Sequence, residues 1–360
     1  TTPELSPQAT MARTTTAGVR HVLPATPETC FWGYFDRDLP PVLEVQSGDV
    51  IEVEAVSHHS GDAPDLLMDD GVTAIWEGIP ESERAPGVHI MTGPISVVGA
   101  VPGSTLLVRV LEMTPRMNYG SNCAAHWGLL HDVFQKERIT IYELDDTTGG
   151  FSSSARPAFG FDFTARELYD LPGVISPPDP EARESFSADV RIPVRPHFGV
   201  MGVAPPDPGR VNSVPPGIFG GNVDNWRLGP GASMAYPVFA DGAGLFVGDP
   251  HFAQGDGEIC GTAIEASLNA VLQVFVLDDV TISSPVLETD DHLILHGFDD
   301  DLDRAMRMAA EQALWFLTER MGLTADDAYS LASVAVDLGI TQVVDGTVGC
   351  HAIVDKVIFG

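Results

Sequence analysis

The stretch from residue 217 to residue 265 constrains the fold of this chain more than any other segment. It reads GIFGGNVDNWRLGPGASMAYPVFADGAGLFVGDPHFAQGDGEICGTAIE, with eleven glycines and one basic residue, Arg227. Glycine has no Cβ, so the backbone can turn tightly and approach a ligand closely. The acidic and imidazole side chains that we consider here are Asp224, Asp249, His251, Asp256, Glu258 and Glu265. A segment that only filled a core would not carry so many carboxylates beside apolar runs.

Within this stretch, the sequence GDPHFAQGDGE predicts a ligand pocket. Asp249 and His251 lie two positions apart, so on an extended strand end they face the same side. Asp256 and Glu258 repeat that spacing, and a turn at Gly255 would bring the two pairs together. Carboxylates and imidazoles are the ligands that hard and borderline metal ions prefer. We therefore expect these four side chains to surround a cation.

These residues also carry a family resemblance. GGNVD at 220–224, followed by VGDPHFAQGDGEICGTAIE at 247–265, resembles the signature of the acetamidase/formamidase family. The resemblance covers most of the chain from about Cys30 and extends to residues 91–113, 195–205 and 340–346. It implies a hydrolase of small amides, including some lactams, with a bound metal in several members. SHHSGDAPDLL at 57–67 differs from the tryptophan- and glycine-rich version of better-known formamidases, so the resemblance does not name the amide.

Hydrophobic periodicity predicts the fold class. Alternation of apolar and charged residues predicts a strand at 50–55, and a second strand is expected at 104–113. An apolar stripe predicts a helix within 299–322, and Thr324 is placed to cap a second helix. The buried face expected for that second helix comprises Leu331, Val334, Ala335 and Leu338. We expect a mixed, β-rich α/β fold, with an N-terminal β-barrel-like or sandwich part and a C-terminal α/β part carrying two helices.

Composition shifts divide the chain into four expected parts. Residues 1–18 form a loose N-terminal tail, and residues 19–139 form a β-rich N-terminal part. The stretch 140–190 is rich in Pro, Ser, Asp and Gly, which predicts a long surface excursion. Residues 191–360 form the α/β part that carries the glycine-rich acidic site.

Charge and cysteine usage exclude several function classes. The formal net charge is −32, from 51 acidic and 19 basic residues, so phosphate backbones and anionic membranes are repelled. The only lysines are Lys136 and Lys356, and neither has a context that suits the lysine-dependent amidase constellations. The four cysteines have no CxxC spacing, which argues against a thiolate zinc site or a disulfide framework. A reduced, cytoplasmic location fits this pattern, and we expect a homo-oligomer.

The expected strand at 50–55 leads directly into His58 and His59. Adjacent side chains on a strand end point to opposite sides, so only one of these histidines is expected to face a given pocket. Either a structural histidine or a metal ligand would fit the pattern. The predicted metal ligands are Asp224, Asp249, His251 and one of this pair, with His59 preferred. Zinc suits such a mixed set, whereas calcium or magnesium would suit an oxygen-only subset.

The expected reaction is metal-assisted hydrolysis of a small neutral amide. Glu258 is the predicted general base, because a base must lie beside the metal without being bound to it. Asn222 and Gln254 offer amide groups to the substrate, and His89, Arg195 and His197 are further predicted substrate contacts. Glu265 lies in a run of small and apolar residues, where a carboxylate is costly unless it is paired or metal-bound. Ligand and base could be exchanged within this set.

Two other interpretations are open at this point. Cys260 could act as a nucleophile with Glu258 two residues earlier, although cysteine in CGTA is typical of a small packed residue. The acidic stretch could also be a structural calcium site in a non-catalytic protein.

Overall fold

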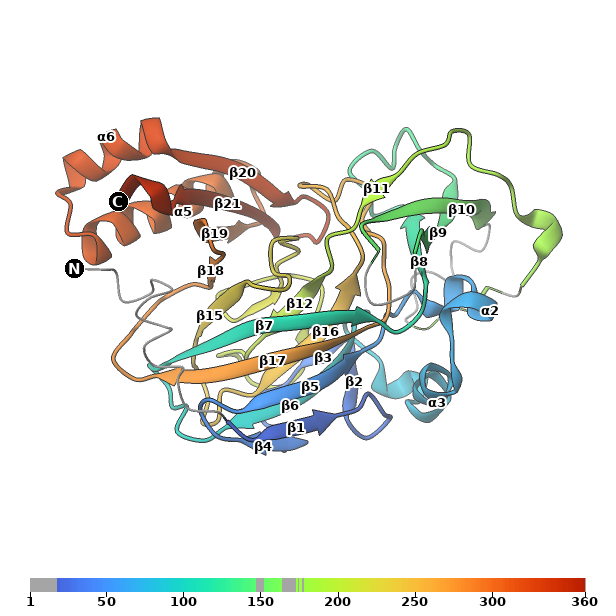
Figure 1. The fold of residues 1–360 in the computed structure, drawn as a ribbon, viewed down its shortest axis with the longest axis horizontal. Helices are drawn as coiled ribbons and strands as arrows, with labels where there is room; N and C mark the ends of the chain where they lie inside the picture. The colour runs from blue at the N-terminus through green and yellow to red at the C-terminus, as the bar shows by residue number, and fades with distance from the viewer. Residues whose placement is uncertain (1–17, 147–151, 164–172, 174, 177, 360) are drawn as a thin grey trace.

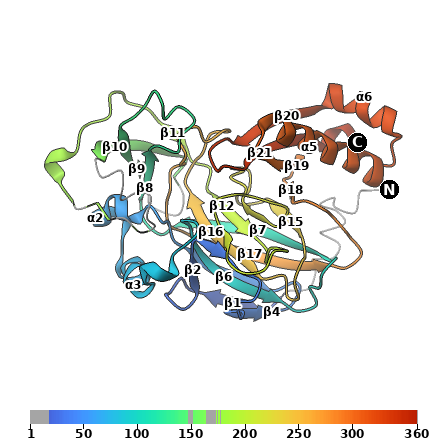
Figure 2. The ribbon, with the colours of Figure 1, turned by 180° about the vertical axis from the view of Figure 1, so that it is seen from behind.

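The computed structural model describes residues 18–146, 152–163, 173, 175–176 and 178–359. It is a mixed, strand-rich fold with four α-helices among the described residues. Long strands fill the middle of the molecule, and smaller modules project from it on two sides (Figure 1; Figure 2 from behind). This agrees with the β-rich class expected from the sequence. The expected tail at 1–18 lies outside the described residues except for Gly18.

The largest sheet has nine strands in a row. In spatial order they are β1 (Arg20–Leu23), β5 (Val50–Ala55), β17 (Leu268–Leu277), β7 (Thr105–Pro115), β15 (Ser233–Pro237), β18 (Val286–Glu288), β19 (His292–Asp299), β21 (Val348–Asp355) and β20 (Val336–Gln342). β5 pairs in parallel with β1 and antiparallel with β17. The alternation predicted for 50–55 is confirmed, because Ile51, Val53 and Ala55 are buried while the residues between them are partly exposed.

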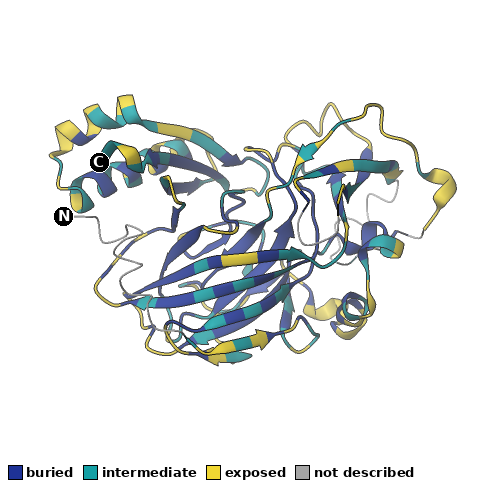
Figure 3. Ribbon diagram, viewed as in Figure 1, coloured by how far each residue is buried: buried dark blue, intermediate teal, exposed yellow. Residues whose placement is uncertain are grey.

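A second sheet packs against this one and completes a sandwich. Its strands are β14 (Gly220–Asn222), β12 (His197–Gly202), β16 (Leu245–His251), β6 (Ile90–Val97) and β2 (Cys30–Trp32), with β4 (Leu43–Val45) paired to β6. One apolar cluster joins the two sheets, for example Val108 and Leu272 from the first with Phe198 and Phe246 from the second. Figure 3 shows these central strands as largely buried. Residues before 139 and after 191 therefore contribute to the same sandwich.

The remaining strands form two smaller sheets. One consists of β11 (Ile192–Pro193), β10 (Ser154–Phe163), β9 (Glu137–Leu144) and β8 (Tyr119–Ala124), and the other pairs β13 (Val211–Asn212) with β3 (Tyr34–Phe35). Part of the expected excursion at 140–190 thus lies in β9 and β10. Residues 147–151, 164–172, 174 and 177 of this excursion lie outside the described residues.

The helices lie at the two ends of the molecule. α2 (Pro64–Leu67) and α3 (Asp70–Gly78) lie on the side of β8, while α5 (Leu302–Trp315) and α6 (Ala325–Ala335) accompany the last strands (Figure 1). α5 begins after Asp301, whose side chain accepts a hydrogen bond from the backbone of Arg304, and it continues as a π-helical turn over Phe316–Arg320. None of the helices among the described residues is long and apolar enough to cross a bilayer.

The second helix is confirmed at its start and only in part on its predicted buried face. The Thr324 side chain accepts a hydrogen bond from the backbone N–H of Asp327, as the capping pattern predicts. Leu331 packs against an apolar cluster that includes the buried Ala328, as predicted, but Val334 is 81% exposed and Leu338 is 49% exposed. The reason is that α6 runs directly into β20 at Val336, so the helical period ends before Leu338.

Candidate active site

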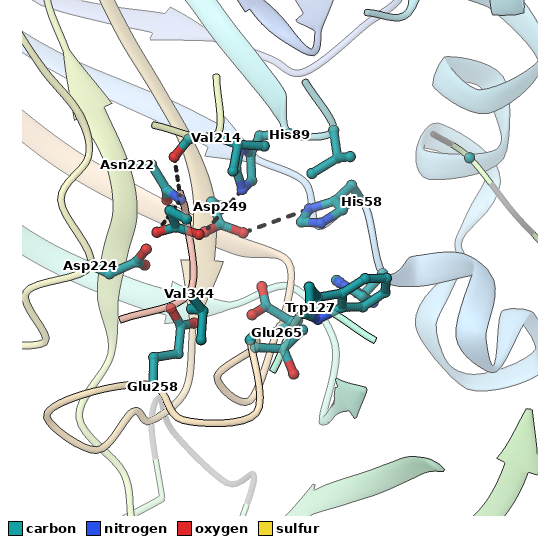
Figure 4. Close-up of a pocket in the computed structure, with 16 residues that line it drawn as sticks. His58, His89, Trp127, Val214, Asn222, Asp224, Asp249, Glu258, Glu265 and Val344 are labelled. Carbon is teal, nitrogen blue, oxygen red and sulfur yellow. Dashed lines mark hydrogen bonds and ion pairs between the residues drawn. The ribbon is translucent and has the colours of Figure 1, made fainter. Parts of the chain in front are cut away.

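A cavity of about 260 Å³ opens where β16 and β14 end (Figure 4). Its described lining comprises three imidazoles, five carboxylates, four large apolar side chains and four smaller residues. They are His58, His59 and His89; Asp224, Asp249, Glu258, Glu265 and Asp345; Val88, Trp127, Val214 and Val344; and Gly173, Asn222, Gly261 and Thr262. The stretch 217–265, on which the sequence analysis centred, therefore supplies much of this cavity.

The end of β16 holds the central pair of side chains. Asp249 Oδ2 lies 3.0 Å from His251 Nε2, so the two face the same side, as their spacing predicts. His251 Nε2 also lies 3.1 Å from Glu265 Oε2, and its Nδ1 lies 3.0 Å from His197 Nε2. Both ring nitrogens of His251 therefore contact protein partners, and the ring is fully buried behind the cavity wall.

A glycine on the neighbouring strand β12 makes room for these groups. A Cβ at Gly199 would lie 2.4 Å from Asp249 Oδ2, 2.6 Å from Asp224 Oδ1 and 2.6 Å from His251 Cε1. Such contacts are shorter than van der Waals packing permits. The close approach of the two carboxylates therefore depends on the missing side chain at Gly199.

His58 and His59 both line the cavity, so the prediction that only one would face it is wrong. The pair does not continue the strand. It lies in a turn after β5, immediately before a 3₁₀ turn at Ser60–Asp62, and a turn does not alternate its side chains. The two ring centroids are 4.3 Å apart. His59 Nδ1 lies 3.0 Å from Asp62 Oδ2, whereas His58 Nδ1 lies 3.6 Å from Asp249 Oδ1.

His89 approaches the same aspartate from another side. Its Nε2 lies 3.7 Å from Asp249 Oδ2, and its Nδ1 lies 2.9 Å from the hydroxyl of Ser213. The ring centroid of His58 is 4.9 Å away. His58, His89 and Asp249 thus offer ligand atoms that lie within 4.8 Å of one another.

The predicted ligands Asp224, Asp249 and His251 also bring ligand atoms within 4.8 Å of one another, as do His251, Glu258 and Glu265. A further group of ligand atoms consists of carboxylates only. Asp224, Glu258 and Asp345 bring oxygens within 4.8 Å of one another. Asn222 donates a hydrogen bond of 3.1 Å to Asp345 Oδ2 and lines the cavity beside it. Asp345 was not among the candidate residues, because it follows what the sequence presents as a closing strand. A carboxylate directly after an apolar strand was the available signal.

Three of the site carboxylates lie on left-handed backbone. The φ angles are +53° at Asp224, +47° at Asp249 and +47° at Glu258. Among the described residues, only Ala85 and Ala243 are further non-glycine positions with positive φ. This conformation is uncommon for residues with a Cβ, and it persists only where the surrounding structure imposes it. The fold therefore holds these three side chains in position at a cost in backbone energy.

Several buried polar atoms at the site have no hydrogen-bond partner within the described protein. They are His58 Nδ1, Asn222 Oδ1, Asp224 Oδ1 and Asp249 Oδ1. Buried polar groups are normally satisfied, because an unpaired one costs about 1–3 kcal/mol. Such atoms, gathered around one cavity, fit a bound cation and a polar ligand.

Burial and mutual repulsion separate the protonation behaviour of these groups. Burial, with the carboxylates of Asp224 and Asp345 nearby, raises the pKa of Glu258 well above its usual value. Burial and the Asp249 carboxylate raise the pKa of Asp224 to about 7. For Asp249 itself, burial opposes ionisation, yet the imidazoles of His251 and His89 hold its pKa well below the usual range.

His251 shows the opposite effect from His58. Although burial disfavours the imidazolium, the carboxylates of Glu265 and Asp249 raise the pKa of His251 well above its usual value. Burial and the neighbouring rings of His59 and His89 lower the pKa of His58. His58 is therefore a neutral ring at neutral pH, which is the form that binds a metal ion.

Three of the predicted substrate contacts do not line the cavity. Gln254 lies behind it, with Oε1 3.1 Å from His197 Nε2 and Nε2 donating to the backbone oxygen of Asp224 over 2.8 Å. His197 Nδ1 is 2.7 Å from the carbonyl oxygen of Arg195. Arg195 itself is exposed and lies over the ring of Trp226, 4.2 Å from its centroid.

Asp256 also points away from the site. It forms a double hydrogen bond of 2.9 Å with Arg227, and its side chain is 40% exposed. The expected pocket of two equivalent pairs is therefore not observed. Glu258 enters the cavity alone, because the left-handed backbone at this residue reverses the strand-like alternation.

Cys260 does not line the cavity either. Its Sγ accepts a hydrogen bond of 3.2 Å from Asn122 and lies 3.6 Å from the carbonyl oxygen of Thr262. This is the environment of a small packed side chain, which weakens the interpretation of Cys260 as a nucleophile.

Comparisons with known proteins find relatives of this chain. The model of the acetamidase/formamidase family matches residues 25–208 and 209–359. A formamidase of Methylophilus methylotrophus is 26% identical over 366 aligned residues, covering 86% of this chain and 84% of that protein. An acetamidase of Mycolicibacterium smegmatis is 30% identical over 260 residues, covering 63% and 61%.

Solved structures show the same fold. An acetamidase from Bacillus halodurans superposes with a TM-score of 0.73 at 26% identity, covering 94% of this chain and 98% of that one. An acetamidase from Yersinia enterocolitica gives 0.74 at 24% identity, covering 96% and 94%.

Proposed function

This chain belongs to the acetamidase/formamidase family and is an amidohydrolase acting on non-peptide C–N bonds; on that premise we propose that it cleaves a small amide with the help of a divalent metal ion. One observation carries the proposal. Three carboxylates on left-handed backbone converge with His58 and His89 on a single cavity, and several of the buried polar atoms there have no protein partner. Strained backbone and unpaired polar atoms concentrate at functional sites.

His58, His89 and Asp249 are the proposed ligands of a zinc ion. Two neutral imidazoles and one carboxylate match the ligand preference of zinc. His58 takes the place of His59, because His59 Nδ1 lies against Asp62. A divalent ion bound there would polarise the amide carbonyl and make a water molecule more acidic.

The carboxylates of Asp224, Glu258 and Asp345 lie beside this set. Asp224, which was expected to be a ligand, belongs to this oxygen-only group, and such a group suits calcium or magnesium. His251 has its ring nitrogens against Asp249, Glu265 and His197, so we propose that it positions Asp249 instead of binding the metal.

Glu258 is the proposed general base and acid. Burial raises the pKa of Glu258, so its carboxylate holds a proton taken from the attacking water more firmly than an exposed glutamate would and can return that proton to the leaving nitrogen. Asn222 is the proposed substrate contact. Its Nδ2 donates 3.1 Å hydrogen bonds to Val214 O and Asp345, while its Oδ1 is unpaired and can accept an N–H of the substrate amide.

Elemental analysis of the purified protein, combined with ammonia release from short amides and lactams, tests the proposal. We expect a divalent metal in the protein as isolated, loss of turnover after chelation, and recovery on adding zinc. Absence of metal together with absence of ammonia would contradict the proposal. A chelated protein that loses thermal stability but never hydrolyses an amide would instead support a structural calcium site.

Location and assembly stay predictions. No disulfide joins the four cysteines, all of which lie within the described residues, and this is consistent with a reduced, cytoplasmic compartment. The exposed apolar residues of α6, including Val334, are consistent with a homo-oligomer, which light scattering would test.

A further inference from the structure

The cavity is larger than its smallest plausible substrates require. It measures about 260 Å³. A water molecule occupies about 30 Å³ of liquid, so the space corresponds to about eight or nine waters, whereas formamide or acetamide displaces only about two or three. Space for a metal ion and an attacking water still leaves a substantial part of the cavity unfilled.

The unfilled part has an apolar wall. Trp127, Val88, Val214 and Val344 reach the cavity from four separate segments of the chain. Figure 4 shows Trp127 beside Glu265 and His58, and Val344 beside Glu258. An acyl group attached to an amide at the polar centre would therefore meet these apolar side chains directly.

The position of Trp127 is fixed by the segment that follows Glu258. A Cβ at Gly261 would lie 1.9 Å from Trp127 Cδ1, so the indole rests on the bare backbone of this glycine. The backbone N–H of Leu129 donates to the carbonyl of Ile259 over 2.8 Å, which attaches the two segments to each other. Trp127 is thus held in place by its neighbours as part of the cavity lining.

The charge of the lining residues restricts which groups the acyl chain of the substrate can carry. None of the described lining residues is a lysine or an arginine, whereas five are carboxylates. A substrate that carries its own carboxylate would be repelled and would lack a partner. The lining therefore favours a neutral amide.

We propose that the preferred substrate is a neutral amide whose apolar acyl group is longer than acetyl and packs against Trp127 and Val344. This inference rests on the proposed function of the same cavity. Burial of one methylene of the substrate against an apolar wall corresponds to about a fourfold gain in kcat/KM. Pentanamide has three methylenes more than acetamide, so kcat/KM is expected to rise by at least about tenfold, and by up to about fiftyfold.

The test measures ammonia release by the metal-loaded enzyme from formamide, acetamide, butanamide, pentanamide and succinamate. Succinamate resembles pentanamide in length but ends in a carboxylate. We expect kcat/KM to rise along the neutral series and to fall at least tenfold from pentanamide to succinamate. If acetamide equals or exceeds pentanamide, this inference is overturned and amide hydrolysis stands. If none of the amides is cleaved, the proposed function fails and this inference fails with it.

Two variants link the preference to the wall. Val344→Phe reduces the space for the acyl group, so the ratio of kcat/KM for pentanamide over acetamide falls at least tenfold. Trp127→Ala enlarges the space for the acyl group, so the amide with the highest kcat/KM becomes a longer one. Val357→Phe is the matched control, because Val357 is 75% exposed and does not line the cavity, and it leaves the ratio unchanged. Val344→Leu, a milder change, gives a smaller shift in the same direction if the phenylalanine variant does not fold. An unchanged ratio in both folded wall variants overturns the inference.

Discussion

Replacing Asp224 by asparagine should stabilise the metal-free protein while removing a site residue. Asp224 is 2% exposed, and its Oδ1 has no hydrogen-bond partner in the described protein. Burial, followed by repulsion from Asp249, raises the pKa of Asp224 from 3.8 to about 7. An ionised Asp224 is therefore unfavourable in the folded protein unless a cation lies beside it.

The sign and size of the effect follow from this change in pKa. Below about pH 4 the Asp224 carboxyl is protonated in both the folded and the unfolded chain, so it does not lower the free energy of unfolding. Between pH 3.8 and about 7 the unfolded chain releases the proton while the folded protein keeps it, and folding stability declines over this window. Each pH unit within this window lowers the free energy of unfolding by about 1.4 kcal/mol, so above pH 7 the wild type has lost at most about 4 kcal/mol of stability. Asparagine has no such loss.

Urea denaturation of chelator-treated protein at pH 4 and pH 8 measures this difference. We expect the free energy of unfolding of Asp224→Asn to exceed that of wild type by about 2–4 kcal/mol more at pH 8 than at pH 4. Asp207→Asn is the control, since Asp207 is exposed in a turn, and its profile should parallel wild type. Zinc should then stabilise wild type more than the Asp224 variant. Parallel pH profiles for wild type and Asp224→Asn would refute the reasoning.

Three further experiments test the proposed roles. Glu258→Gln should lower kcat by at least about a hundredfold with little change in KM, because it removes proton transfer and keeps the shape; steady-state kinetics at pH 7 would check this. His58→Ala should lower the zinc content measured by elemental analysis more than His59→Ala does, since His59 Nδ1 faces Asp62; the reverse order would return His59 to the ligand set. Cys260→Ala should keep at least about a third of wild-type activity, and complete loss of turnover would revive the nucleophilic interpretation.

Features that depend on neighbouring residues were predictable from the sequence. The alternation in β5, the cap at Thr324 and the shared side of Asp249 and His251 all arise within a few residues, where backbone period fixes the direction of side chains. The concentration of functional groups in 217–265 was predictable for the same reason, because glycine and carboxylate content are local properties.

Features that depend on distant contacts were not predictable. Asp345 enters the cavity only because β20 pairs with β21 at the far edge of the large sheet, and because Gly257 bridges to Gln342. His58 joins His59 in the cavity because the chain leaves β5 in a turn, and nothing in the two adjacent letters indicates where the strand ends. Glutamate seldom adopts a left-handed backbone. At Glu258 this conformation turns the side chain away from the direction that the spacing from Asp256 predicts.

The energetics of the site connect its geometry to its proposed cation. Left-handed backbone at Asp224, Asp249 and Glu258 costs of order 1–3 kcal/mol at each residue, and the buried carboxylates repel one another as well. His251 offsets only part of this repulsion, since it lies between Asp249 and Glu265 and contributes one positive charge. The packing of the two sheets must therefore hold these carboxylates together in the metal-free chain. A bound divalent ion would reduce the repulsion between them. For that reason metal binding and folding stability should rise and fall together in this protein, with Asp224 as the residue at which the link is measured.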